Sequence, residues 1–212
     1  MGQSNGGESM KFETQTHFQR FMLGIICGLL PVACLLFGLL GEFRGINYPG
    51  WYVSISATYF ANSNMCMIGA LCLCAFFLFT YQGYDLGDKV FTTIAAIAAL
   101  LIVACPTIAT PDEYIGLFAL PKKVSHTIHN VSAATLFISF ALMILTQFTK
   151  GENKRRNIIY IICGIVMLIF MSILAFGSFF GLPAYRIMIC ETGMLWAFAV
   201  AWIIKSGVFS KI

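Results

Sequence analysis

The sequence has few charged residues. Asp, Glu, Lys and Arg together make up 10% of its 212 residues, whereas a soluble domain is normally about a quarter charged. Hydrophobic residues make up 59% of the chain, and its mean hydropathy is +0.84. This composition excludes a water-soluble globular protein, because too few polar side chains remain to cover a wet surface.

The sequence also lacks the familiar motifs of enzymes and nucleotide-binding proteins. It has no glycine-rich phosphate loop, no complete catalytic set, and no Cys-x-x-Cys pair among its eight cysteines. The cysteines lie within or at the ends of apolar stretches, which is typical of small thiols packed in a helix bundle. No basic groove interleaved with aromatic residues indicates nucleic-acid binding. The motifs therefore predict no cofactor and no nucleic-acid partner.

Six long apolar stretches fill most of the chain. Each is about 18 to 23 residues long, which is enough to cross the hydrocarbon core of a bilayer as a helix. Backbone amides in hydrocarbon must bond within a helix or a closed barrel, and these stretches lack the alternation of barrel strands. The sequence therefore predicts an all-α, polytopic membrane protein, a bundle of six transmembrane helices within residues 21–206. The expected spans are residues 21–41, 64–81, 90–109, 128–148, 158–180 and 187–204.

The basic residues are unevenly distributed between the two sides. Cytoplasmic segments of membrane proteins retain Lys and Arg, and one side of this chain holds nine of the 13 basic residues. We therefore expect both termini to be cytoplasmic, in a plasma membrane or a bacterial inner membrane. Residues 1–20 are polar and glycine-rich and predict a disordered cytoplasmic tail, and residues 207–212 predict a second tail. The nine residues are Lys11, Arg20, Lys89, Lys150, Lys154, Arg155, Arg156, Lys205 and Lys211.

Small residues mark the helix faces that can approach closely. Gly24-x-x-x-Gly28 opens the first span, and Gly193, Ala197 and Ala201 form a similar stripe on the sixth. In lipid, helices associate through close backbone approach and van der Waals packing. We expect these faces to pack within one bundle; the alternative is a homodimer formed through them.

The loop between the first two spans is long and rich in aromatic and hydroxyl residues. Loops of this length are often functional. Ser54, Ser56 and Thr58 alternate with apolar residues, so an extended segment would place their hydroxyls on one face. Two interpretations remain open, a structural cap over the helix ends and a loop that contacts a ligand.

The loop before the fourth span predicts a short interfacial helix over residues 110–121. Thr110 suits the N-cap and Pro111 the first helical position. Asp112 and Glu113 would complement the positive end of the helix dipole, and Pro121 would end the helix. The two acids are therefore expected to start a helix and not to act in catalysis.

A few polar side chains are predicted to lie at the outer end of the bundle. His126 and His129 are three residues apart and share one helix face, with Asn130 beside them. Glu191 is the only acidic residue inside any span, about a turn and a half from Arg186. A charge in hydrocarbon is costly unless it is paired, so Glu191 should face the bundle interior with a histidine, Arg186 or a hydroxyl as its partner.

One pattern of residues extends over most of the chain. It consists of an outer loop, two apolar stretches, and a histidine that opens the fourth stretch. The order resembles that of the six-helix Frag/DRAM/Sfk group of membrane proteins and its bacterial relatives. The resemblance implies a lipid-associated membrane protein with a cytoplasmic N-terminus and a role in phosphoinositide or lipid-anchor handling. The residues that carry it are Pro49, Ile55, Ser56, Thr58, His129, Ala133, Ala134, Leu136 and Phe137.

Two alternative functions use the same polar residues. His126 and His129 give the chain a fainter resemblance to the ceramidase and adiponectin-receptor superfamily, which implies a zinc-dependent lipid amide hydrolase. A zinc ion would then be held by His126, His129 and Glu191, or with Asp112 as the third ligand. In an ion or small-solute transporter, Glu191 would instead relay a proton or a cation.

We favour the hypothesis that the protein is not an enzyme and binds a membrane lipid headgroup or a small polar ligand. This hypothesis involves no metal ion. The expected outward pocket would use Arg186 for a phosphate or carboxylate, with histidines and hydroxyls to orient it. Membrane lipids are the expected partners. The expected ligand-binding residues are Glu191, Arg186, His126, His129, Ser54, Ser56, Thr58 and Asn130.

Overall fold

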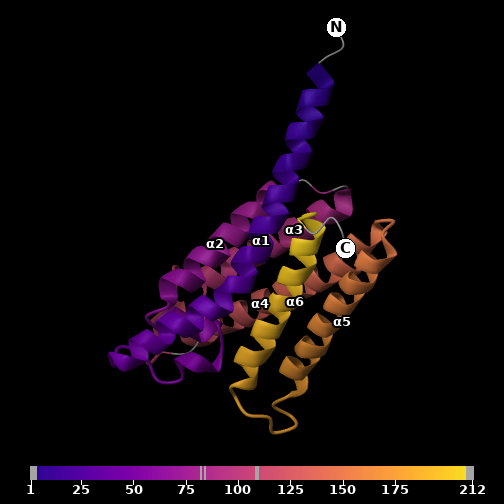
Figure 1. Ribbon diagram of the computed structural model, residues 1–212. Helices are drawn as coiled ribbons and strands as arrows, with labels where there is room; N and C mark the ends of the chain where they lie inside the picture. Colours follow the sequence, from indigo (N-terminus) through magenta and orange to yellow (C-terminus); the bar gives the residue numbers. More distant parts are fainter. Residues whose placement is uncertain (1–3, 82, 84, 108–109, 209–212) are drawn as a thin grey trace.

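The structure is a bundle of six α-helices (Figure 1). This computed structural model describes the backbone of residues 4–81, 83, 85–107 and 110–208, and the side chains from Gln15 onward. Short 3₁₀ helices and one two-stranded hairpin lie between the α-helices. In chain order, the elements are α1 (Ser4–Phe43), η1 (Trp51–Val53), η2 (Ser56–Phe60), α2 (Asn64–Thr80), α3 (Leu86–Ala104), β1 (Tyr114–Ile115), β2 (Leu120–Pro121), α4 (Lys122–Thr146), η3 (Phe148–Lys150), α5 (Lys154–Phe176) and α6 (Arg186–Lys205).

The six helices form a closed ring. Each helix packs against its neighbours in the sequence, and α6 closes the ring by packing along α1. Successive helices run in opposite directions (Figure 1). Two sets of loops result: residues 44–63, 105–107, 110–121 and 177–185 lie at one end, and residues 81, 83, 85, 147–153 and 206–208 lie at the other. We call these the outer end and the inner end.

Five of the helices are long and apolar enough to cross a membrane. They are α1 from Gln15, α3, α4 with its extension to Lys150, α5 and α6. The remaining helix, α2, is equally apolar and has 17 residues. Five such helices in one chain indicate an integral membrane protein.

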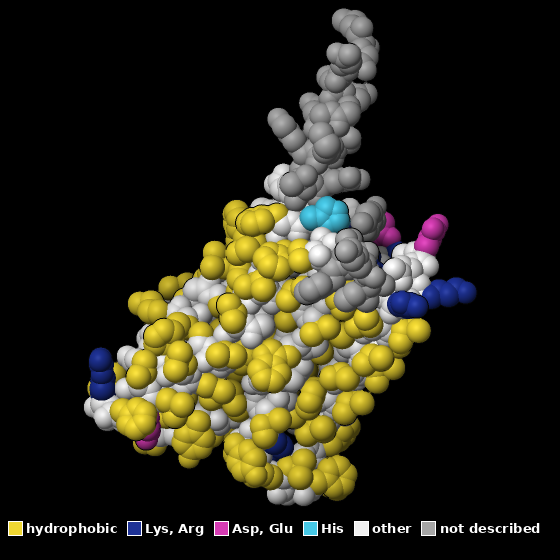
Figure 2. Space-filling view, in the orientation of Figure 1, with side chains coloured by type: hydrophobic (Ala, Val, Ile, Leu, Met, Phe, Trp, Pro, Cys, Tyr) yellow, Lys and Arg dark blue, Asp and Glu magenta, His cyan; other side chains and the backbone are white. Residues whose placement is uncertain are grey.

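The outer surface of the bundle is apolar. Figure 2 shows hydrophobic side chains over the middle of the molecule, with charged side chains gathered near its two ends. Large aliphatic residues such as Ile162 and Ile169 on α5 are more than half exposed. A soluble monomer rarely exposes an apolar surface of this extent, whereas lipid chains would cover it.

The contact between α1 and α6 depends on glycine. A Cβ atom at Gly24 would lie 2.5 Å from Ile203 Cγ1, and one at Gly28 would lie 3.3 Å from Ala199 Cβ. The Trp196 Nε1–H group donates to the Gly28 carbonyl at 3.1 Å across the same contact. The Gly24-x-x-x-Gly28 face is thus used within the chain, as the sequence predicted.

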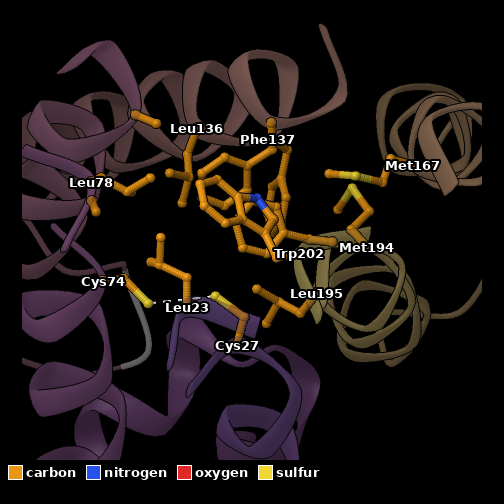
Figure 3. Packing of buried hydrophobic residues seen from close by; sticks show 14 of the residues in the cluster. Leu23, Cys27, Cys74, Leu78, Leu136, Phe137, Met167, Met194, Leu195 and Trp202 are labelled. Atoms are coloured by element: carbon orange, nitrogen blue, oxygen red, sulfur yellow. Dashed lines mark hydrogen bonds between the residues drawn. The ribbon is translucent and has the colours of Figure 1, made fainter. Parts of the chain in front are cut away.

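The inner half of the core contains a cluster of aromatic rings, and Figure 3 shows Trp202 among the buried side chains. The Phe140 and Phe198 rings stack with centroids 3.8 Å apart, and Trp202 contacts Tyr81 and Phe148 edge to face at 5.1 and 5.2 Å. Offset and edge-to-face pairs of this kind stabilise a core beyond the area that they bury. The rings join α4 and α6 to the ends of α2 and η3.

The inner end differs from the disordered tail expected over residues 1–20. Helix α1 begins at Ser4, and from Gln15 onward its side chains pack on the bundle: Thr16, Gln19 and Arg20 are buried. The Gln19 amide donates to Thr80 Oγ1 at 3.2 Å. These polar residues meet the polar ends of α2 and α6, so the packed domain begins before the apolar stretch. Residues 1–3 and 209–212, at the far ends of the two expected tails, lie outside the described residues.

The prediction of a helix over residues 110–121 is wrong. Strands β1 and β2 pair antiparallel instead, around a turn with Gly116 and Ala119 at positive φ. The Leu117 amide donates to the Ala104 carbonyl at 2.8 Å, and a Cβ at Gly116 would lie 2.5 Å from that oxygen. The turn therefore satisfies a carbonyl at the end of α3, which a surface helix would leave unpaired. Thr110 accordingly bonds to Asp112 and caps no helix.

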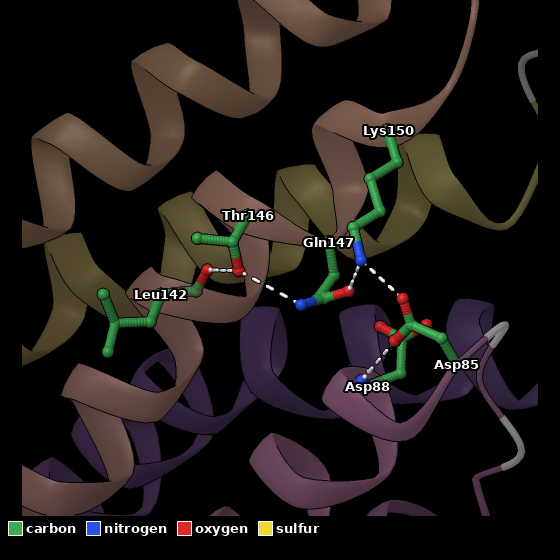
Figure 4. A network of polar contacts seen from close by, with 6 residues as sticks. All are labelled: Asp85, Asp88, Leu142, Thr146, Gln147 and Lys150. Carbon is green, nitrogen blue, oxygen red and sulfur yellow. Dashed lines mark hydrogen bonds and ion pairs between the residues drawn. The ribbon is translucent and has the colours of Figure 1, made fainter.

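A polar network joins α3 to the α4–α5 connection at the inner end (Figure 4). Lys150 forms an ion pair with Asp85 and also donates to Gln147. Asp85 caps α3 by accepting the Asp88 amide at 3.0 Å. The hydrogen bond from the Lys150 ammonium and, to a lesser extent, the bond from the Asp88 amide hold the pKa of the Asp85 carboxyl below its usual value.

We expect Gly24→Ala to destabilise the bundle by about 1–3 kcal/mol, the usual cost of forcing extra volume into a packed interior. The matched control is Gly69→Ala on α2, where nothing lies within 4 Å of the added Cβ. Thermal unfolding of both variants in one detergent compares them. Equal melting temperatures for the two variants would contradict the close α1–α6 contact.

We expect the Asp85–Lys150 link to weaken as the pH falls below about 4, the ordinary pKa of an unfolded Asp. A carboxyl whose pKa is lowered by folding contributes stability above its unfolded pKa and loses it as the pH falls through the folded pKa. Melting temperatures from about pH 6 to pH 3 should therefore decline slightly more for wild type than for Asp85→Asn, because solvent screens this exposed pair. The exposed Glu113→Gln variant is the control and should follow wild type. Parallel curves for wild type and Asp85→Asn would contradict the assignment.

Candidate functional site

Glu191 is buried in α6 and holds the loop of residues 51–60. Its side chain is 8% exposed, and Oε2 accepts the backbone N–H of Ile55 at 2.6 Å. The amide and hydroxyl of Ser56 are also close enough to act on the carboxylate. The partner of the intramembrane acid is thus mainly the loop backbone, and neither a histidine nor Arg186 pairs with it.

The loop forms the short helices η1 and η2 and is not an extended segment. Its turns are closed by its own hydroxyls, because Ser54 Oγ accepts the Ala57 amide at 2.9 Å and Thr58 Oγ1 donates to the Ile55 carbonyl at 2.5 Å. Ser54, Ser56 and Thr58 are all buried, and so are Ile55 and Ala57 between them. An extended strand would expose one of these two sets. The loop instead packs with both sets inward and covers the outer end of the bundle.

Trp51 fixes the start of this cover. Its indole N–H donates to Glu42 at 2.8 Å, and its ring fills the space above Gly38, where a Cβ would lie 2.1 Å from Cζ3. Gly50 precedes it with a φ of +83°, a conformation that favours glycine. The chain therefore turns sharply at Gly50 and presses the Trp51 ring onto α1.

A small cavity lies beneath the cover, next to Glu191. Its volume is about 40 Å³, which is room for about one water molecule. Its walls are apolar apart from Ser56 and Glu191, and they include Leu30, Met67 and Phe137. A lipid headgroup does not fit into this space. The cavity suits a single water bonded to the carboxylate.

The histidines bind the chain segment that follows α3. His129 is 2% exposed and its Nδ1 lies 2.9 Å from the Cys105 carbonyl oxygen, which can only accept, so Nδ1 carries the proton. Ser125 Oγ donates to the Pro106 carbonyl at 2.8 Å. His126 Nδ1 lies 3.1 Å from Thr107 Oγ1. Three successive residues after α3 are thereby tied to the first turns of α4.

This contact explains why α4 begins at Lys122 and not near residue 128. The apolar stretch marks only the part of the helix inside the membrane, whereas its first turns are polar because they satisfy the end of α3. Asn130 belongs to the same network, since its amide donates to His126 Nε2 at 3.0 Å. The end of the predicted third span, residues 108–109, lies outside the described residues.

Arg186 builds the connection between α5 and α6. Its guanidinium donates to the Leu182 and Pro183 carbonyls at 2.7 and 3.1 Å and to the Ser178 hydroxyl. Its buried Nε has no partner among the described residues. Three of its five N–H groups are used in this way, and besides the buried Nε–H one N–H group on Nη2 is left for another acceptor. Arg186 and Glu191, both described, share no ion pair.

The expected ligand-binding residues thus lie in three separate networks. Glu191 joins the hydroxyl loop, the histidines and Asn130 join the end of α3, and Arg186 joins the α5–α6 connection. Within the part of the chain that the structure describes, no group of three or more His, Cys, Asp or Glu side chains could hold a metal ion. The set His126, His129 and Glu191 is therefore not assembled as a zinc site.

A groove on the surface of α5 was not anticipated from the sequence. Its volume is about 440 Å³, and it runs from Ile165 along α5 to Phe180 and Leu182 in the outer connection. Ser172 lies in its floor, with its hydroxyl satisfied by the Leu168 carbonyl at 2.9 Å. Gly177 lines the outer part of the groove, and a Cβ there would lie 2.5 Å from Arg186 Nε. The Arg186 side chain therefore packs next to the outer part of the groove.

No family model matches the chain, and no curated protein or solved structure is significantly similar to it.

We expect Glu191→Ala to release the cover, because it leaves the Ile55 amide buried without an acceptor, at a cost of about 1–3 kcal/mol. Glu191→Gln keeps an oxygen that can accept this bond and should leave the cover in place. Hydrogen exchange of residues 51–60 in detergent measures the difference. Equal protection in wild type and Glu191→Ala would show that the carboxylate does not hold the loop.

Proposed function

We propose that this protein is a six-span, non-enzymatic membrane protein that binds a membrane lipid at its outer end. The lipid would place one acyl chain in the α5 groove and its phosphate against Arg186. The observation that carries the proposal is the proximity of the two parts, since Gly177, on which the guanidinium packs, lines the outer part of the groove. Lipid handling is also what the resemblance to the Frag/DRAM/Sfk group implies.

The groove has the chemistry of an acyl-chain site. Its walls are aliphatic and aromatic side chains of one helix face, and Phe176 and Phe180 at its outer end are largely exposed. An acyl chain that fits the groove makes closer van der Waals contacts with its walls than loosely packed bulk lipid does. Shape and dispersion therefore favour one bound lipid. A polar ligand without an acyl chain would leave the groove empty.

The Arg186 side chain is suited to bind a lipid headgroup. A guanidinium donates charge-assisted hydrogen bonds to phosphate oxygens, and bonds of this kind are about twice as strong as neutral ones. The Leu182 and Pro183 carbonyls fix the orientation of the group before the lipid arrives. Lipid binding is favoured over the amide hydrolase because the residues of the hydrolase site lie in separate networks.

The proposed topology has both termini on the cytoplasmic side, with α2 as a sixth, slightly shorter span. The inner end carries Lys150, Lys154, Arg155 and Arg156 in one connection, whereas the outer connections hold fewer cations. Such a bias retains the richer side in the cytoplasm. In this orientation Arg186 faces the outer leaflet of a plasma membrane or a bacterial inner membrane.

We expect Arg186→Gln to weaken lipid binding about tenfold, as expected for the loss of a charged hydrogen-bond donor. Native mass spectrometry of protein released from phospholipid nanodiscs would count the retained lipid. The control is Arg44→Gln, which removes an exposed arginine of the same end. Ser172→Phe should lower retention as well, because it fills the groove without changing Arg186. Equal retention by all four proteins would overturn the proposal.

A further inference from the structure

The inner end carries a polar pocket that the outer lipid site does not involve. Its volume is about 240 Å³, several times the ~30 Å³ occupied by one water in the liquid. Three helices that are distant in the sequence form its walls. Helix α1 contributes His17 and Arg20, α5 contributes Arg156 and Asn157, and α6 contributes Lys205.

The pocket gathers positive charge. Arg20 and Arg156 are both close enough to Lys205 to act on its charge, and Asp88 is the acid that opposes them. Glu152 lies on the rim and is exposed to solvent. Three cationic side chains from three helices thus border one pocket, and this arrangement favours an anion over a neutral ligand.

The cationic groups are held in place by the fold. Arg20 is 2% exposed and its Nε donates to the Tyr81 hydroxyl at 3.0 Å. The Lys205 ammonium donates to the Phe148 carbonyl at 3.3 Å and lies 5.1 Å from the centre of the Phe148 ring. His17 Nδ1 lies 2.6 Å from the Ser206 carbonyl. An anion would therefore meet groups that are already oriented, which lowers the entropy lost on binding.

The first turn of α5 borders the same pocket. The Asn153 side chain caps it by accepting the Arg155 and Arg156 amides at 3.0 and 3.2 Å. Gly151 and Asn153 are both in the pocket wall. The positive end of this helix dipole thus adds to the field of the side chains.

Apolar surface continues directly from the pocket along α5. Ile158, Ile161 and Ile162 follow Asn157 and are 57%, 42% and 55% exposed. A phosphate held in the pocket would therefore have lipid-facing surface beside it for an acyl chain. A free phosphate would make no use of this surface.

We propose that this pocket binds the phosphate group of an anionic lipid from the leaflet at the inner end. Basic residues beside a membrane surface attract anionic lipids, and here they are concentrated in one pocket instead of being spread along a tail. The site is independent of Arg186, which lies at the opposite end of the bundle. Loss of either site would leave the other unchanged.

The test uses the full chain in detergent, titrated with phosphatidylglycerol and, separately, with phosphatidylcholine, with bound lipid counted by native mass spectrometry. We expect tighter binding of phosphatidylglycerol by wild type. Arg156→Gln should weaken that binding about fivefold, the factor expected for one basic residue at a membrane surface. The matched control is Arg155→Gln, its exposed neighbour on α5 outside the pocket wall, which should bind as wild type does.

Glu152→Gln gives a change in the opposite direction that does not depend on the stability of Arg156→Gln. Removing the rim carboxylate should tighten binding of phosphatidylglycerol several-fold, because a like charge leaves the site. The proposal is overturned if Arg155→Gln and Arg156→Gln lose affinity equally, or if Glu152→Gln leaves it unchanged. A parallel titration with inorganic phosphate identifies the source. Saturable binding of phosphate that weakens in Arg156→Gln, without preference for phosphatidylglycerol, would overturn the lipid assignment.

Discussion

Polar groups at the outer ends of the helices are paired with side chains from other elements, and the rest of the structure depends on this pairing. An unsatisfied amide or carbonyl costs several kcal/mol in hydrocarbon, roughly the net stability of a small domain. Glu191 takes up the Ile55 amide, His129 takes up the Cys105 carbonyl, and Asn47 donates to the Gly38 carbonyl at 2.6 Å. The acid and the histidine are therefore anchors for irregular chain segments at the edge of the membrane.

This pairing separates the two kinds of polar residue in the protein. Those at the outer end of α4 and in the hydroxyl loop have their hydrogen bonds within the chain, and they stabilise the fold. Arg186 and the cations around Lys205 also bond within the chain, but each of them lies beside an open groove or pocket as well. A binding function belongs with the second kind, because a ligand needs both a charge to meet and a space to occupy.

The helices could be predicted from the sequence, whereas the loops could not. Apolar length determines a membrane helix locally, so six helices lie where the apolar stretches predicted them, apart from their ends, and five of them are long and apolar enough to cross a membrane. The hairpin at Gly116 and the helical turns at Ser56 depend on Ala104 and Glu191, which are distant partners. The sequence correctly indicated that Glu191 needs a partner, but it indicated a side chain. A bond from a backbone amide cannot be predicted from residue identities, because every residue except proline carries this group. The α5 groove could not be predicted either, because it depends on which helix face the rest of the bundle leaves uncovered.

The closing of the helix ring between α1 and α6 sets an order of events during synthesis. Each of the other contacts between neighbouring helices can form as soon as the second helix leaves the ribosome and enters the bilayer. The glycine face of α1 has to wait for Ala199 and Ile203, which are translated after the other five helices of the bundle. Until then lipid tails are left to cover Gly24 and Gly28. The ring is therefore completed by α6, and a chain that stops before α6 is left with α1 unpartnered on that side.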